Sequence, residues 1–382
     1  MRPSALWNLG FRPFYLLASA FAALSMALWS LEATGHLPHG YLGAPLRHGH
    51  EMLYGYTLAV IAGFLFTSVR VWTGQPTPTG YPLMGIAALW IAGRVLILTP
   101  FALTASLVNA AFPVAVAIGI AIPLARAGNR RNYFFVALLL LAACSEIAFY
   151  LAWRGTIGWP ERATLQVGLD LVLFIIAVIS GRVVPMFTNN AIPGAGASRN
   201  AALEKAALGA VLALLACDIA QAPAPLIGAV ALFAAIAHAA RLALWRPWRT
   251  FGTPLVWILH AGYAWIVVHL VLRSGAAFGC VAASLEIHAL TAGAIGAMTL
   301  GMMTRTARGH TGRALAADGF DVACYALVLL AAVLRVFGVM LLPGAYVAMI
   351  LASGGCWSAA FALFAVRYWP VLSRPRIDGK PG

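Results

Sequence analysis

Apolar runs long enough to cross a lipid bilayer recur from one end of the chain to the other. A bilayer core about 30 Å thick needs about 20 apolar residues per helix. Only helices and closed barrels satisfy their own backbone hydrogen bonds there, and these runs lack the period-two alternation of barrel strands. The chain is 62% hydrophobic and 9% charged, whereas about a quarter of a soluble domain is charged. The sequence therefore predicts an all-α integral membrane protein.

About twelve transmembrane helices are predicted from the apolar runs. They lie in the windows 14–33, 48–69, 81–98, 102–125, 133–152, 163–183, 203–220, 225–245, 253–272, 281–303, 320–341 and 345–366. The connections between them are short, and only 184–202 and 304–319 have room for a binding role. Residues 1–382 are therefore expected to form a single polytopic transmembrane domain, with no soluble domain.

Most of the 25 lysine and arginine residues fall on one side of the predicted membrane. The exceptions are Arg47, Arg154, Arg162 and Arg273 in outer connections, with Arg94 and Arg335 inside spans. Because basic connections stay in the cytoplasm, both termini are predicted to be inside (N-in/C-in). The formal charge of +14 then follows from topology, and no nucleic-acid partner is expected.

A cluster of metal-capable side chains opens the second predicted span. The stretch LRHGHEMLYG places His48, His50 and Glu51 at its outer start. The tenth span also begins on the outer side, which puts His288 about 10 Å deep at 1.5 Å per residue. These residues are therefore expected at similar depths on one side of the membrane.

Two more histidines lie in the ninth predicted span. His269 is about one turn from the outer surface, and His260 lies deeper. Their spacing points them in nearly opposite directions on a helix, so at most one faces a given site. A lone intramembrane histidine is often an interhelical hydrogen-bonding residue, and this alternative is open for His260 and for His238 in the eighth span.

These residue types predict a site for haem and copper. An ionisable residue inside a bilayer is costly and is kept for a partner or a function, and neutral imidazole suits copper and haem iron. His50 and His288 could ligate one haem from opposite faces, and His260 is a further cofactor-binding candidate. The metal-binding candidates are His48, His50, Glu51, His269 and His288. No catalytic residue is assigned.

Other residues allow predictions of how a haem would be held and what would lie around it. The five cysteines are scattered singly, without the C-x-x-C-H motif of covalent attachment, so a haem would be held non-covalently. Gly55, Gly293 and Gly296 would leave room for its flat ring between helices. Arg94 and Arg335 are predicted to pair with Glu146, Asp170 or Asp218, or with a haem propionate.

The second and tenth spans share a spacing. Arg70 and Thr73-Gly74 follow His50 at the same distances as Arg308 and Thr311-Gly312 follow His288. A repeat of this kind would make spans one to four and nine to twelve related units. A third unit would begin near position 163, giving three four-helix units as in haem-copper oxidase catalytic subunits.

Several long motifs resemble the NnrS family of bacterial membrane proteins. They are GFRPFYLLA, RHGHEMLYGYTLAVIAGFLFTSVRVWTG, LWIAGR, GRVVPMFTNNAIPG, HAGYAW and HALTAGAIGAMTLGMMTRTARGHTGR. The resemblance runs from about Gly10 to Arg313, and the last two spans are generic. It implies a twelve-span protein of the bacterial inner membrane that contains haem, taken here as b-type, and copper, and that protects against nitrosative stress.

Three hypotheses of function follow. In the first, the protein binds or exchanges electrons with nitric oxide near the periplasmic face; the electron donor is unknown, and an enzyme and a non-enzyme are both possible. In the second, it is a divergent haem-copper oxidase or nitric oxide reductase relative, although Glu286-x-His288 replaces the expected histidine pair. In the third, it is a transporter or membrane chaperone for copper or haem, with helices broken at Pro113, Pro123 or Pro185.

Overall fold

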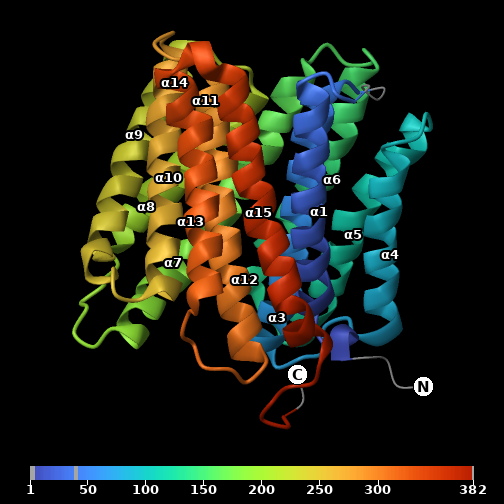
Figure 1. Cartoon of the computed structure of the whole chain (residues 1–382), viewed down its shortest axis with the longest axis vertical. Coiled ribbons are helices and arrows are strands. Elements are labelled where there is room, and N and C mark those ends of the chain that lie inside the picture. Colours follow the sequence, from blue (N-terminus) through green and yellow to red (C-terminus); the bar gives the residue numbers. More distant parts are fainter. Residues whose placement is uncertain (1–4, 38–41, 381–382) are drawn as a thin grey trace. The chain divides into compact units, whose positions relative to one another are not determined.

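The computed structural model describes residues 5–37 and 42–380, and every regular element in those ranges is helical (Figure 1). The α-helices are α1 (Phe11–Ala33), α2 (Ala44–His50), α3 (Leu58–Thr73), α4 (Gly80–Leu96), α5 (Ala102–Arg126), α6 (Phe134–Trp153), α7 (Glu161–Ala191), α8 (Ala201–Ile219), α9 (Ala224–Leu244), α10 (Pro254–Ala277), α11 (Ala283–His288), α12 (Gly296–His310), α13 (Gly319–Val333), α14 (Val339–Leu341) and α15 (Tyr346–Ser373). Three π-helical segments are η2 (Glu51–Thr57), η5 (Ala289–Ile295) and η6 (Leu334–Gly338). The all-α prediction is confirmed.

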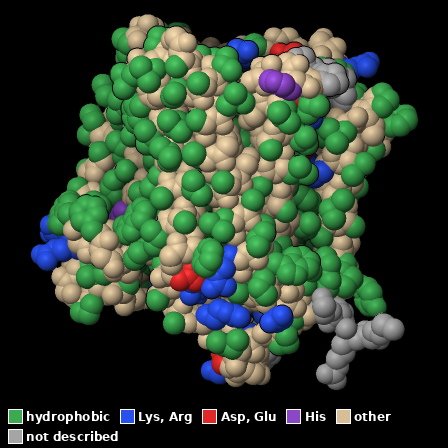
Figure 2. All heavy atoms as spheres, in the orientation of Figure 1, with side chains coloured by type: hydrophobic (Ala, Val, Ile, Leu, Met, Phe, Trp, Pro, Cys, Tyr) green, Lys and Arg blue, Asp and Glu red, His purple; other side chains and the backbone are tan. Residues whose placement is uncertain are grey.

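Ten helical segments within the described ranges are long and apolar enough to cross a membrane. A helix occupies each of the twelve predicted windows, but α4 and α8 are outside this set. The first is only 17 residues long, and the second carries three charged side chains, Glu204, Lys205 and Asp218. Apolar side chains also cover much of the face seen in Figure 2. The chain is therefore a multi-pass membrane protein.

The chain divides into two compact units, which are described separately. Unit 1 comprises Met1–Leu169, Thr306–Ala314 and Phe361–Gly382, and unit 2 comprises Asp170–Arg305 and Leu315–Ala360. In unit 1, α1 packs on α3, and α5 packs on both α4 and α6. In unit 2, α9 packs on both α8 and α10, while η5 packs on α10 and α13 (Figure 1).

The prolines do not break their helices. Pro113 and Pro123 lie inside α5, and Pro185 lies inside α7, which continues to Ala191. The predicted connection 184–202 is therefore shorter than expected, as is 304–319, because α12 extends to His310. A proline is tolerated in a membrane helix where neighbouring groups satisfy the carbonyl it leaves free. The broken helices of the transporter hypothesis are absent at these three positions.

The two histidine-bearing spans have the same irregularity. A seven-residue π-helical segment begins directly after His50, and another seven-residue segment begins directly after His288. The opposite end of each span also has the same pattern. The hydroxyl groups of Thr73 and Thr311 each donate to a main-chain oxygen one turn earlier, that of Val69 and that of Ala307, at 2.6 Å. A left-handed glycine, with φ of 66° at Gly74 and 79° at Gly312, follows each threonine. These features agree with the predicted repeat.

Candidate functional site

His50 lies at the centre of a buried polar network in unit 1. Its Nδ1 is 2.9 Å from Oε1 of Glu51, and its Nε2 is 2.8 Å from Oε1 of Glu146 on α6. The three residues are 1%, 5% and 2% exposed. When both carboxyl groups are ionised they only accept hydrogen bonds, so both ring nitrogens must donate. His50 is then a cation between two anions.

Arg94 on α4 completes this network. Its guanidinium donates to Oε1 of Glu51 at 2.7 Å and to Oδ1 of Asn109, and Asn109 is held by the main chain of Ala105. Arg94 and His50 together balance the charges of Glu51 and Glu146. The carboxylate partners predicted for Arg94, which were Glu146, Asp170 or Asp218, were wrong, because Arg94 pairs with Glu51. The alternative partner, a haem propionate, stays a prediction.

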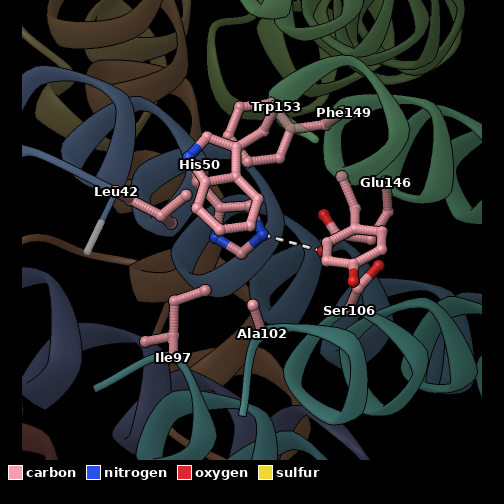
Figure 3. Close-up of a pocket in the computed structure, with 9 residues that line it drawn as sticks. Leu42, His50, Ile97, Ala102, Ser106, Glu146, Phe149 and Trp153 are labelled. Atoms are coloured by element: carbon pink, nitrogen blue, oxygen red, sulfur yellow. Dashed lines mark hydrogen bonds and ion pairs between the residues drawn. The ribbon is translucent and has the colours of Figure 1, made fainter. Parts of the chain in front are cut away.

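A small pocket with about 10 Å³ of free space lies beside His50 (Figure 3). It is lined by Leu42, His50, Ile97, Ala102, Ser106, Glu146, Phe149, Tyr150 and Trp153. That space is about the size needed for one water molecule, so the pocket has no room for a haem. The nitrogen and oxygen donors that face it suit a small transition-metal ion better.

We expect Glu146→Gln to destabilise the protein by about 1 to 2 kcal/mol. The amide keeps an acceptor for His50 but replaces a charge-assisted hydrogen bond with a weaker neutral one. Thermal unfolding of the purified protein in detergent would measure the change. Ser106→Ala is the matched control, because the Ser106 hydroxyl lines the same pocket and is buried without a hydrogen-bond partner. Equal effects of the two substitutions would contradict the assignment.

Protein side chains fill the space beside Gly55, Gly293 and Gly296, where room for a haem ring was predicted. A Cβ at Gly55 would overlap the Arg94 guanidinium and the Phe21 ring, and one at Gly293 would overlap the Trp265 indole. At Gly296 it would lie 2.6 Å from the Trp357 ring. The expectation that these glycines leave room for a flat macrocycle was therefore wrong: they allow close packing of large side chains.

His269 on α10 forms a second histidine–carboxylate pair, in unit 2. The ring is 0% exposed, and its Nδ1 lies 2.9 Å from the main-chain oxygen of Glu286 and 3.0 Å from Oε2 of that residue. The main-chain oxygen of Glu286 accepts from Nδ1, so the ring proton lies on Nδ1; Oε2 of Glu286 makes no hydrogen bond. Nε2 is then an unprotonated nitrogen, and it is buried with no hydrogen-bond partner. Metal-ligating histidines have this arrangement, with the other ring nitrogen held by a carbonyl or carboxylate.

The other predicted ligands have different surroundings. Nδ1 of His288 donates to the main-chain oxygen of Ser284 at 2.6 Å, so Nε2 is its unprotonated nitrogen. Nε2 of His260 is 2.9 Å from Thr188 Oγ1, and its Nδ1 is buried without a hydrogen-bond partner. His48 stacks on the Trp29 ring, with 4.3 Å between the ring centres.

The predicted ligands are divided between the two units. His48, His50 and Glu51 belong to unit 1, whereas His260, His269 and His288 belong to unit 2. In the described part of the chain, no three histidine, cysteine, aspartate or glutamate side chains are grouped so that they could hold a metal ion. The ligand set therefore stays a prediction.

Two networks of buried arginines in unit 2 were not predicted from the sequence. Arg241 donates to both carboxylate oxygens of Glu204, at 2.8 and 2.6 Å, and to the Tyr263 hydroxyl at 2.8 Å. Arg273, expected in an outer connection, lies within α10 and pairs with Asp170 at 2.6 Å and with Asp218. The sequence signal was the presence of acidic residues inside the spans.

His238 belongs to the first of these networks. The Tyr263 hydroxyl is 2.6 Å from its Nδ1, and its Nε2 is 3.2 Å from the main-chain oxygen of Ala207. Both ring nitrogens are therefore satisfied within the protein, as the hydrogen-bonding alternative expects.

The fold and these buried networks define a polytopic helical membrane protein with histidine–carboxylate pairs inside its spans. Comparison with protein families then identifies the group. The chain belongs to the NnrS family, whose model, described as NnrS protein, matches residues 5–376. No curated protein matches the sequence.

Proposed function

We propose that this chain is a haem- and copper-containing protein of the bacterial inner membrane that protects against nitrosative stress by binding nitric oxide or exchanging electrons with it. Its twelve helical segments would all cross the membrane, with both termini inside. Membership of the NnrS family supports the class of protein. The observation that supports a metal site is that Nε2 of His269 is buried without a hydrogen-bond partner.

We assign His269 as a copper ligand. Imidazole nitrogen suits copper, and a nitrogen buried without a hydrogen-bond partner is costly unless something binds it. The main-chain oxygen of Glu286 accepts from Nδ1 and holds the ring, and its carboxylate lies 3.0 Å from the same nitrogen. That contact fixes the tautomer and makes Nε2 a better donor. A copper ion bound there would supply a site for a one-electron exchange.

We assign His288 as the haem ligand, in preference to His50. The Ser284 carbonyl holds Nδ1 of His288 and so orients the opposite nitrogen. By contrast, both nitrogens of His50 are engaged by carboxylates, and the adjoining pocket has only about 10 Å³ of free space. His50 and Glu146 would instead bind a small metal ion, with release of a proton from the ring.

The test is the reduced-minus-oxidised absorbance spectrum of the purified protein, with iron and copper analysis and a nitric oxide titration. We expect a haem band in the wild type that shifts with nitric oxide and is lost in His288→Ala. His36→Ala, at an exposed position in the turn after α1, is the control and should keep the band. A colourless wild-type protein that binds no metal would contradict the proposed function.

A further inference from the structure

Arg335 lies in the π-helical segment η6 of unit 2 and is almost fully buried. It is 5% exposed, and its Nε and Nη1 have no hydrogen-bond partner. The uncharged Tyr346 hydroxyl contacts its guanidinium. Unused donors on a buried charged group are costly, and π-helical segments often occur at functional sites. Arg335 is therefore expected to have a partner that the chain itself does not supply.

Arg335 differs from the other buried arginines of unit 2 in its lack of a carboxylate partner. Arg241 and Arg273 each form an ion pair with a buried acidic side chain. No aspartate or glutamate occurs in 322–377, and no carboxylate of the described residues acts on Arg335. The acidic residues predicted as its partners pair with other side chains, so that prediction was wrong: Glu146, Asp170 and Asp218.

Helix packing in unit 2 places η6 beside the helix that ends with His288. α13 packs on η5 and η6 packs on α11, so these two segments run antiparallel. Trp265 on α10 contacts Phe337 of η6, with 5.6 Å between the ring centres, and it also lies against Gly293 of η5. Figure 1 shows α11 and α14, which directly follows η6, at the same end of unit 2. Arg335 therefore belongs to the surroundings of the proposed haem ligand.

The burial of these donors restricts the kind of ligand that could use them. Nε and Nη1 of Arg335 are closed to solvent, so an exchangeable ion or a lipid headgroup at the surface would not reach them. A prosthetic group that the folding chain encloses carries its charged groups into the protein. The donors of Arg335 therefore suit an anionic group of a resident cofactor.

A haem carries such anionic groups as its propionates. A guanidinium and a carboxylate form charge-assisted hydrogen bonds, which are roughly twice as strong as neutral ones. An ionisable residue inside a membrane span is usually kept for a partner of this kind. We propose that Arg335 binds a propionate of the haem assigned to His288, an inference that rests on the proposed function.

The experiment titrates the full-length protein, produced without haem and held in detergent, with protohaem and with its dimethyl ester. The ester has the same ring and iron but no charged propionate. Absorbance should show that the wild type binds protohaem at least about 10-fold more tightly than the ester, and that Arg335→Gln binds the two forms equally. Equal affinities in the wild type would overturn the inference and leave the proposed function standing. A wild type that binds neither form would overturn both.

Three further variants separate the charge of Arg335 from its surroundings. Arg154→Gln removes an arginine from an exposed position between α6 and α7 and should keep the wild-type preference for protohaem. Tyr346→Phe removes the hydroxyl contact but leaves the guanidinium, so it should keep the preference as well. If Arg335→Gln does not fold, Arg335→Lys retains the charge and should reduce the preference without abolishing it. An unchanged preference in the Arg335 variant, or an equal loss in Arg154→Gln, would overturn the inference.

Discussion

His269→Ala is expected to lose its copper, with affinity lower by at least about 100-fold, while the haem band of the protein remains. The unpaired Nε2 of His269 is the proposed donor, and its loss should weaken binding at least as much as the 10-fold to 100-fold typical of residues that only hold a ligand in place. Copper analysis after dialysis against a weak chelator would measure the loss, together with the absorbance spectrum.

Two further variants separate ligation from packing. His269→Gln keeps most of the volume but removes the imidazole, so it should lose copper while retaining the melting temperature of the wild type within a few degrees. Glu286→Gln keeps the main-chain acceptor of His269 and removes only the carboxylate, so copper affinity should fall by about 10-fold. Wild-type copper content in both His269 variants would exclude this residue as a ligand.

A large loss of stability is expected when Arg241 is substituted. Arg241→Ala should destabilise the protein by about 3 to 5 kcal/mol, because it leaves the carboxylate of Glu204 buried without its main partner. Arg241 is only 1% exposed and also donates to the main-chain oxygen of Ala177 at 2.9 Å. Thermal or denaturant unfolding in detergent would measure the loss.

Controls for this prediction lie on the same helices. Lys205→Ala removes a positive charge from an exposed position next to Glu204 and should change stability by no more than about 0.5 kcal/mol. The double variant Arg241→Met with Glu204→Leu removes both charges, so it should be more stable than Arg241→Ala alone. If the double variant is instead the less stable of the two, an unpaired buried carboxylate is not the cause of the loss.

The sequence allowed the helices to be predicted because span length and hydropathy are properties of single segments. A helix lies in each predicted window, and the errors fall at the ends, where α7 continues through Pro185 to Ala191 and α12 reaches His310. Polar side chains in the last turns made these segments resemble connections. Tertiary neighbours decide where a membrane helix ends, and a single segment does not contain that information.

The partners of the buried charges were harder to predict. His50 and Glu51 were both identified, but the contacts from Glu146 and Arg94 depend on how α4 and α6 pack around η2. A charged residue in an apolar span is predicted to have a partner, but the hydropathy of the span does not identify that partner. Arg273 was assigned to a connection because it lies near the end of a predicted span, and the structure buries it against Asp170.

The π-helical segment after His50 has a consequence for how the histidine is aimed. A π-helical turn accommodates one residue more than an α-helical turn, and each residue of a helix accounts for about 100° of rotation. Removing one residue from Glu51–Thr57 would therefore swing His50 about a quarter of the way around the helix, away from Glu146. The direction of the imidazole is set by the winding of the main chain, so a change in chain length would redirect it even if every side chain were kept.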